Sequence, residues 1–313
     1  MASLISLISD CQQELRRHVE YGNINGALEQ INNGADPNYR YKDGAAIIHI
    51  IAERNQIKMF KEIIKTFEGL KINMKHSQLG VTALMISVFL YKTEMVVALL
   101  EENADPNILD NKKQSALHYS TQRGDIKITQ ILLRYGANSV NKNIFDNTPL
   151  SQAVIEVPNL TITFLLLQFE YSTDYMGDLF LDACLYCNSR KRKNITMLLI
   201  HIGRANINYQ HRDTKKSCLH ILAMTNYVPL AVSLLREGAD VNLKDIDNRL
   251  AIDVANEHRN VEMYSLLTAN EKEIKSYSPL PATASKKSVV FSIPSEVIIP
   301  KPKEKKHISF SFK

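Results

Sequence analysis

Tryptophan is absent from this chain of 313 residues, which contains only 11 glycines and four cysteines. Little glycine and no tryptophan argue against a β-rich fold and against an enzyme built on glycine-rich loops. The sequence has no phosphate loop of the type G-x-x-x-x-G-K-S/T or G-x-G-x-x-G, no G-x-S-x-G nucleophile turn and no H-E-x-x-H helix. We therefore expect no catalytic residues, no cofactor and no bound metal.

Signals for a membrane or for secretion are also missing. The first eight residues lack the basic segment and the long apolar core of a signal peptide. The longest apolar run, around residues 162–167, is much shorter than a membrane span. Cys184 and Cys187 have the spacing of a zinc-binding pair, but no second pair completes four ligands, so we interpret them as apolar core residues. We predict a cytoplasmic or nuclear protein with no membrane partner.

The excess of positive charge lies at one end of the chain. The net charge is +5, and residues 270–313 contain nine lysines and four acidic residues. Subtracting these from the totals of 38 and 33 leaves 29 basic and 29 acidic residues in the rest. A neutral body binds nucleic acid poorly, so we expect no nucleic-acid partner.

A five-residue pattern recurs along the chain at a fixed spacing. It reads Gly-Ala-Asp-Pro-Asn at 34–38, Asn-Ala-Asp-Pro-Asn at 103–107 and Gly-Ala-Asp-Val-Asn at 238–242. Weaker copies occupy residues 70–73, 136–138 and 204–208. Ala104 and Ala137 are 33 residues apart, and the other intervals are close to this value or twice it. Such a period indicates an array of one small unit.

A second pattern follows each anchor after about ten residues. It reads Ser-Ala-Leu-His at 115–118 and Thr-Pro-Leu-Ser at 148–151, and three copies end in His49, His118 and His220. The two patterns keep a common register over roughly residues 10–268, and together they resemble the ankyrin repeat with its T-P-L-H element. The histidines of different stacked repeats cannot converge on one ion, so we interpret them as structural.

The resemblance implies an all-α solenoid of about seven helix-turn-helix units with short β-hairpin loops, and a role in protein binding. We divide the chain into N-terminal capping helices at 1–32, ankyrin repeats at 33–268 and a tail at 269–313. The tail is rich in Pro, Lys and Ser, so we predict that it is disordered when free. A basic run at 188–193 is interpreted as a solvated loop, with an anionic partner contact or a nuclear import signal as alternatives.

The resemblance also implies that partners bind the concave face and the hairpin tips. When the repeats are aligned, four of the six residue pairs expected on the concave face contain an apolar residue. A contiguous strip of these residues would form a recognition patch; alternatively, they turn inward and fill gaps between repeats. Tyrosine and arginine at the hairpin tips are frequent at binding hot spots. The predicted partner-binding residues are Tyr39, Arg40, Tyr41, Arg54, Phe89, Leu90, Arg123, Ile155, Tyr186 and Met224.

The tail contains a segment that resembles the docking motif for the catalytic subunit of type-1 protein phosphatase. Lys306, Ile308 and Phe310 supply its basic residue, its Val or Ile and its Phe. A segment of this kind adds to a sheet edge, while alternate side chains fill two apolar pockets. A second, looser match consists of Lys287, Val289 and Phe291.

Two serines lie inside these matches. A phosphate on Ser288 or Ser309 would place charge in an apolar groove and release the phosphatase. Known ankyrin regulators of this phosphatase carry the motif before their repeats, whereas here it follows them. The sequence thus predicts a monomeric, non-catalytic adaptor whose array binds one protein and whose tail recruits the phosphatase. The alternative is a stoichiometric inhibitor or scaffold that masks a partner through the concave face, with the tail only a linker or a nuclear import signal.

Overall fold

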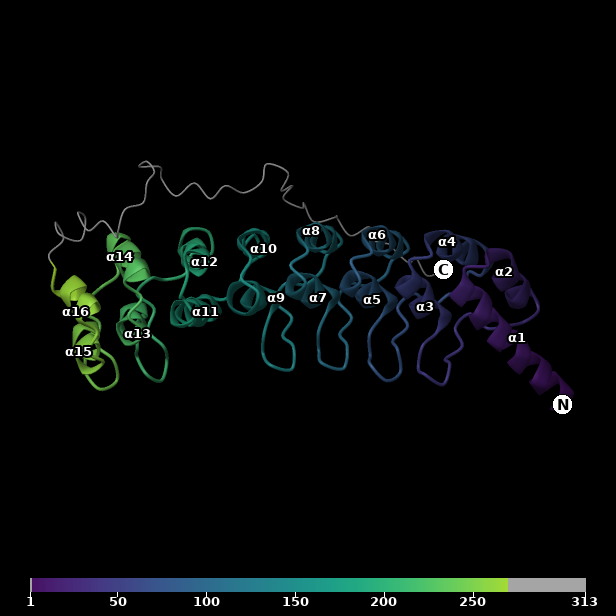
Figure 1. Cartoon of the computed structure of the whole chain (residues 1–313), viewed down its shortest axis with the longest axis horizontal. Coiled ribbons are helices and arrows are strands. Elements are labelled where there is room, and N and C mark those ends of the chain that lie inside the picture. The colour runs from purple at the N-terminus through teal and green to yellow at the C-terminus, as the bar shows by residue number, and fades with distance from the viewer. Residues whose placement is uncertain (1, 270–313) are drawn as a thin grey trace, which may run out of the picture. The chain divides into compact units, whose positions relative to one another are not determined.

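Residues 2–269 are described in the computed structural model of this chain (Figure 1). They divide into two units, residues 2–149 and residues 150–269. Residues 270–313, which contain both predicted phosphatase-docking motifs and the two predicted phosphorylation sites, lie outside the described residues.

The first unit is a stack of helix pairs in two layers (Figure 1). Its first-helix layer consists of α1 (Ala2–Tyr21), α3 (Ile47–Arg54), α5 (Ala83–Phe89) and α7 (Ala116–Gln122). Its second-helix layer consists of α2 (Ile24–Asn32), α4 (Ile57–Thr66), α6 (Thr93–Glu101) and α8 (Ile126–Arg134). Each helix contacts its pair mate and the next helix of its own layer. This arrangement confirms the predicted all-α solenoid, in which every pair is covered by its neighbours.

The second unit repeats this plan with one irregular member. The short α9 (Pro149–Ser151) leads into a π-helix, η1 (Gln152–Glu156), which contacts α10, α11 and α12 in place of an ordinary first helix. The remaining helices are α10 (Leu160–Leu166), α11 (Thr173–Leu185), α12 (Arg190–His201), α13 (Cys218–Thr225), α14 (Val228–Arg236), α15 (Ala251–Glu257) and α16 (Val261–Thr268).

The basic run of the second unit does not form the predicted loop. Arg190 to Lys193 form the first turn of α12. The helix begins there because the side chain of Ser189 caps it, accepting a hydrogen bond from the backbone N–H of Arg192 at 3.4 Å. The interpretation as a solvated loop was therefore wrong, since a capping residue next to the run favours a helix over a loop.

Buried aliphatic side chains join the two layers. Ile51 of α3, Ile63 of α4 and Leu99 of α6 are completely buried. Burying a side chain of this size stabilises the fold by about 1.5–3 kcal/mol before entropy is counted. No single helix pair contains enough such residues, so stability depends on stacking.

The loops between successive pairs fold back as tight turns. The first is closed by a hydrogen bond from the Tyr41 N–H to the Ala45 carbonyl at 2.8 Å, and the later loops have an equivalent bond except the short loop between α10 and α11. Within residues 2–269 the β pairing is limited to one isolated antiparallel bridge between Lys75 and Thr82. These hairpin loops therefore have the predicted path but are not built from strands.

Three buried histidines each connect one repeat to the next. The ring Nδ1 of His118 accepts a hydrogen bond from the Ser115 N–H at 3.1 Å, so the hydrogen is on Nε2, which donates to the Asn147 carbonyl at 3.1 Å. His49 reaches the Met74 carbonyl, and His220 reaches a carbonyl in the following hairpin loop, in the same way. Burial lowers the pKa of His49 and His118, so the neutral form is favoured in the folded protein. The predicted structural role is confirmed, and we call these residues struts.

The last repeat has an aspartate at the strut position. The Asp253 carboxylate accepts a hydrogen bond from the Leu250 N–H at 2.8 Å, as the Nδ1 atoms do in the other repeats. No further repeat follows α16 among the described residues, so a second hydrogen-bonding arm would have no carbonyl to reach. Aspartate therefore supplies the half of the strut that the last repeat can use.

Candidate protein-binding site

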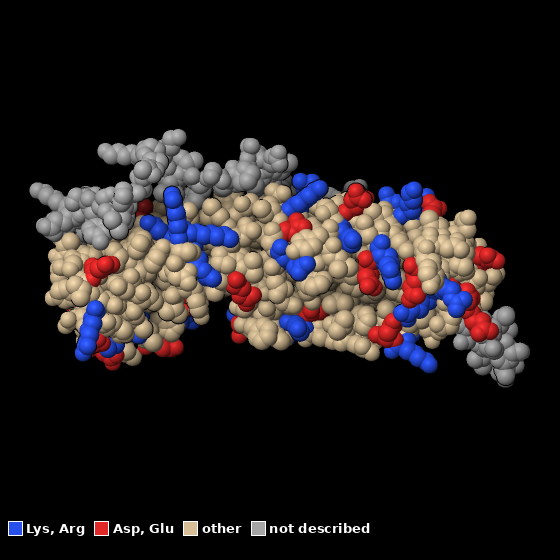
Figure 2. All heavy atoms as spheres, in the orientation of Figure 1, with Lys and Arg blue, Asp and Glu red and all other residues tan. Residues whose placement is uncertain are grey.

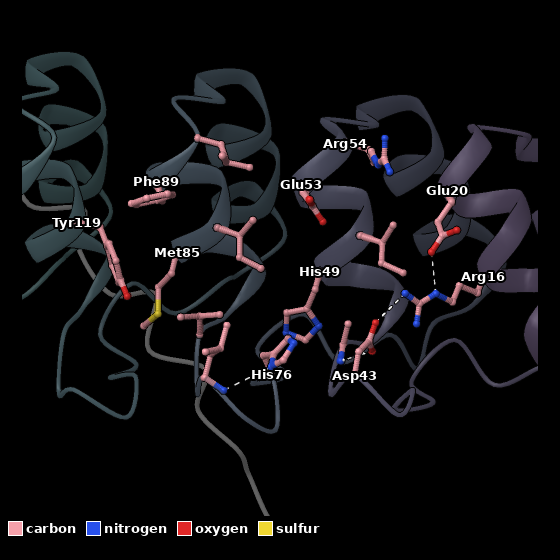
Figure 3. A pocket seen from close by; sticks show the side chains of 16 residues that line it. Arg16, Glu20, Asp43, His49, Glu53, Arg54, His76, Met85, Phe89 and Tyr119 are labelled. Atoms are coloured by element: carbon pink, nitrogen blue, oxygen red, sulfur yellow. Dashed lines mark hydrogen bonds and ion pairs between the residues drawn. The ribbon is translucent and has the colours of Figure 1, made fainter.

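A groove of about 550 Å³ opens on the first unit (Figure 3). It lies along the exposed face of α1, α3, α5 and α7 and is bordered by the first two hairpin loops. Because first helices stack side by side, each contributes the same face to the groove, so residues far apart in sequence form one surface.

One end of the groove is charged. The Arg16 guanidinium pairs with Glu20 and with Asp43, both at 2.7 Å, and lies 4.9 Å from the centre of the Tyr41 ring. The hydrogen bond from Arg16 holds the pKa of Asp43 below its usual value. These charges satisfy one another, so this end is polar but not strongly electropositive or electronegative.

The other end of the groove is apolar. Met85 and Ile86 of α5 and Val81 of the preceding loop form its floor. The Phe89 ring, 45% exposed, stands edge-to-face against Tyr119 of α7 with ring centres 6.1 Å apart (Figure 3). An exposed aromatic ring above an aliphatic floor offers burial to a large apolar side chain of a partner.

A hydrogen bond to a buried carboxylate holds Tyr119 in place. Its hydroxyl donates to the Asp110 carboxylate at 2.7 Å, and Asp110 is itself buried in the hairpin loop before α7. Burial, with this hydrogen bond, raises the pKa of Tyr119 well above its usual range. The ring therefore stays neutral and fixed, which gives the apolar end of the groove a rigid wall.

Arg123 borders the apolar end. Its guanidinium carbon lies 4.7 Å from the centre of the Phe89 ring and 4.5 Å from the centre of the Tyr91 ring. The Tyr91 hydroxyl donates to the Arg123 carbonyl at 3.3 Å. Two cation–π contacts thus hold an exposed arginine at the border between two repeats.

The structure brings several predicted partner-binding residues together. Arg54, Phe89 and Leu90 line the groove, and Arg123 touches it through Phe89. Tyr39 and Arg40 are exposed on the first hairpin loop but do not line the groove; the Arg40 guanidinium donates to a backbone carbonyl of the next loop at 2.7 Å. Tyr39 and Arg40 remain predicted contacts outside the groove.

Tyr41 must be removed from the predicted contacts. Its side chain is only 4% exposed, and its hydroxyl donates to the Gln12 carbonyl of α1 at 3.0 Å. A partner therefore cannot reach it. The Tyr41 side chain is buried because α1 packs over it, and nothing in the repeat pattern indicates this contact.

Three predicted contacts belong to the second unit. Tyr186 is 50% exposed at the end of α11. Ile155 is half-buried in η1, and its carbonyl accepts a hydrogen bond from the Arg192 guanidinium at 3.0 Å. Met224 is half-buried, with its sulfur 3.4 Å from the Lys216 ammonium nitrogen. None of the three lines the groove of the first unit, and they remain untested as contacts.

The sequence reasoning missed much of the groove floor. Ile50 and Met85 lie four residues before Arg54 and Phe89, on the same helix face. Residues four apart on a helix are neighbours, so extending each predicted pair by one turn would have found them. The loop residues His76 and Leu79 gave no signal, because the fold of the hairpin loop alone places them at the groove.

Charge is mixed over the face of the first unit shown in Figure 2, where basic and acidic side chains alternate. Within residues 2–269, no group of three His, Cys, Asp or Glu side chains is placed to hold a metal ion. Burial raises the pKa of Cys187 to about 11, so its thiol is protonated at neutral pH. The helices of this described part also include none that is long and apolar enough to span a bilayer.

Comparisons with known proteins agree with the repeat pattern. A family model described as ankyrin repeats in three copies matches residues 15–110 and 89–176, and a single ankyrin repeat model matches residues 214–246. These matches cover more than half of the chain.

Similar proteins carry the same repeats. Ankyrin repeat protein L371 of Acanthamoeba polyphaga mimivirus is 28% identical over 138 residues, which are 44% of this chain and 18% of that protein. Ankyrin repeat protein L92 of the same virus is 40% identical over 92 residues, 27% of this chain and 22% of that protein. The B-cell lymphoma 3 protein homolog of Mus musculus is 26% identical over 233 residues, 71% of this chain and 50% of that protein. This chain thus spans half or less of each of these relatives.

Proposed function

Because the chain belongs to the ankyrin-repeat family, we propose that it is a non-catalytic adaptor that holds one protein in the groove of its first unit and recruits type-1 protein phosphatase through its tail. The observation that carries the binding half is the groove itself. It runs across α1, α3, α5 and α7, and its apolar end contains the exposed ring of Phe89. Burial of apolar side chains on such a surface is the main driving force of protein association.

The recruiting half rests on the sequence of the tail. The segment around Ile308 and Phe310 has the spacing that lets alternate side chains of an added strand fill two pockets. The lysines before it would face an acidic rim of the phosphatase. The adaptor would then bring the phosphatase to whatever protein the groove holds.

The test is binding of the full chain to the phosphatase catalytic subunit by calorimetry. We expect micromolar or tighter affinity that is lost when Ile308→Ala and Phe310→Ala are combined. The same pair of changes at Val289 and Phe291 assigns the second motif, and Ser295→Ala, outside both motifs, is the matched control. Ser309→Asp is expected to weaken binding, because it places a charge in the apolar groove of the phosphatase.

Failure of this binding would remove the recruiting half of the proposal. Only the groove would then remain as a binding element, which fits the alternative function: a stoichiometric inhibitor that masks its partner, with the tail as a linker or import signal. The two differ in one measurement: deletion of residues 270–313 abolishes the effect of an adaptor on its partner and spares that of an inhibitor.

The proposal includes a monomer in the cytoplasm or nucleus, with protein partners only. Light scattering tests the monomer, and microscopy of the tagged full chain tests the compartment. Limited proteolysis tests the division at residues 32 and 268, because a free tail is cut long before a stacked repeat.

A further inference from the structure

The geometry around Arg123 points to the chemistry of the partner, and this inference rests on the groove proposed above as the binding site. We propose that Arg123 receives the carboxylate of an Asp or Glu in the partner, and that a large apolar side chain next to this carboxylate enters the groove beside Phe89. The occupant is therefore a short acidic and apolar segment of another protein.

The first argument is that Arg123 is held in place but still has free donors. The rings of Phe89 and Tyr91 lie under its guanidinium at 4.7 and 4.5 Å. Ring faces stabilise the positive charge but accept little from the N–H groups, which point outward in the guanidinium plane. The Arg123 guanidinium makes no ion pair or hydrogen bond with another described residue, and the bond from the Tyr91 hydroxyl goes to the Arg123 carbonyl. A carboxylate that approaches in this plane can accept two parallel hydrogen bonds.

The second argument is the backbone of Tyr91. This residue has φ 57°, in the left-handed region, at the joint between α5 and α6. The same joint is occupied in other repeats by Asn55, Gly124 and Asn226, and in the last repeat by Arg259, all with positive φ. Asparagine and glycine adopt this conformation easily, whereas a bulky tyrosine does so against a steric penalty.

Packing does not account for the tyrosine at this joint. Tyr91 is 48% exposed, so only part of its surface is buried in exchange for its strained backbone. Its contacts are the ring face under Arg123 and the hydroxyl on the Arg123 carbonyl. Strained residues that persist without a packing reason gather at functional sites, and here the strain orients one arginine.

The third argument is the distribution of charge along the groove. At the charged end, Glu20 and Asp43 are both engaged by Arg16. Glu53 and Arg54 of α3 add one charge of each sign between the two ends. At the apolar end, Arg123 is the charged residue that touches Phe89, and the described residues supply it with no carboxylate. A partner that brings one carboxylate to this end, next to an apolar side chain for Phe89 and Met85, complements both features.

The probe is a random library of short peptides displayed on phage and selected on the immobilised full chain. The consensus peptide is then synthesised with its acidic residue and, as a matched analogue, with the corresponding amide. Binding of both is measured to the wild-type chain and to Arg123→Gln, Tyr91→Asn and Ile86→Asp. Arg134→Gln, on the exposed face of the last turn of α8, is the control for a lost positive charge.

We expect an acidic residue beside a large apolar one in the selected peptides. Arg123→Gln should weaken the acidic peptide about tenfold, which corresponds to about 1.4 kcal/mol, and leave the amide analogue unchanged. Tyr91→Asn should weaken the acidic peptide severalfold without lowering the Tm, because asparagine accepts the left-handed backbone. Arg134→Gln should change neither affinity.

Several outcomes would overturn the inference, and they separate it from the proposed function. Two results would refute carboxylate binding by Arg123 but still support the groove as the binding site. In the first, the selected peptides lose binding with Ile86→Asp but contain no acidic residue. In the second, Arg123→Gln weakens both analogues equally. If neither Ile86→Asp nor Arg123→Gln changes the affinity of the selected peptides, the groove is refuted as the binding site as well. If Glu296→Lys in the tail tightens peptide binding tenfold, the occupant is this chain's own acidic segment at 296–299 and not a partner.

Discussion

Removal of the His118 strut should cost much of the stability of the first unit. The side chain is completely buried and bonds in two directions, to the Ser115 N–H at 3.1 Å and to the Asn147 carbonyl at 3.1 Å. In His118→Ala, the Ser115 N–H is left buried without this partner, at about 1–3 kcal/mol. The Asn147 carbonyl keeps a second hydrogen bond, from the Asn143 N–H, so its loss is nearer to about 1 kcal/mol.

The cavity left by the ring adds about 1 kcal/mol or more, so we expect a total of about 3–5 kcal/mol. A natural control exists in the last repeat, where Asp253 makes only the first of the two contacts and its side chain is exposed. Asp253→Ala should cost about 1 kcal/mol, like the loss of a helix cap. His118→Asn, which keeps an acceptor near Ser115 but is too short for the Asn147 carbonyl, should fall between the two.

The assay is urea unfolding followed by far-UV circular dichroism, with the free energy of unfolding extrapolated to water. If His118→Ala costs less than about 1 kcal/mol, or no more than Asp253→Ala, then the contact to the next repeat carries no stability and the strut interpretation is refuted. A similar loss in His118→Asn and His118→Ala would place all the energy in the contact to the next repeat.

Other perturbations test the remaining contacts. The Tm should fall as the pH drops below about 6.5, since burial lowers the pKa of both first-unit struts and the unfolded chain then binds more protons; a flat Tm between about pH 6.5 and about pH 5 would contradict this. Gly80→Ala should cost about 1–3 kcal/mol in urea unfolding, because φ is +72° and a new Cβ would lie 2.8 Å from the Asn111 backbone nitrogen. Gly136→Ala, with φ +82° and open space around it, should lose less, and equal losses would exclude the steric reason. Tyr41→Phe should cost about 1 kcal/mol by the same assay through its lost hydrogen bond to the Gln12 carbonyl, whereas an exposed tyrosine would show no loss.

The repeat period predicted the solenoid because the same short-range contacts recur in successive units. The cap at Ser115, the buried Leu117 and the strut at His118 depend on residues three apart or fewer, so their pattern is visible in one copy and confirmed by the next. The struts were predicted to bond to the neighbouring backbone, and they do. Patterns that recur with the fold are therefore the part that sequence alone resolves.

The errors arose where a residue departs from the average repeat. Tyr41 has the position of an exposed hairpin tip, but Gln12 and Arg16 of α1 cover it, a contact between residues almost thirty apart. The run at 188–193 looked like a loop because four successive cations disfavour a helix start, yet Ser189 caps it. Tyr91 has the left-handed backbone that Asn55, Gly124 and Asn226 have at the same joint, but a tyrosine, unlike asparagine or glycine, gives no sequence signal of it.

The struts give the array a direction. Each histidine donates forward, to a carbonyl about 25 to 29 residues later in the chain, and none donates backward. A ribosome delivers the chain in this same order, so His118 has its second partner only after the hairpin loop of the following repeat has emerged. Each of the three repeats with a strut thus lacks one hydrogen bond until the next repeat has been synthesised, whereas Asp253 in the last repeat needs no later residue. Truncation from the two ends should therefore have different effects. A cut just after α8 leaves the buried Nε2–H of His118 without its acceptor, whereas loss of α1 and α2 leaves the partners of all three histidines in place.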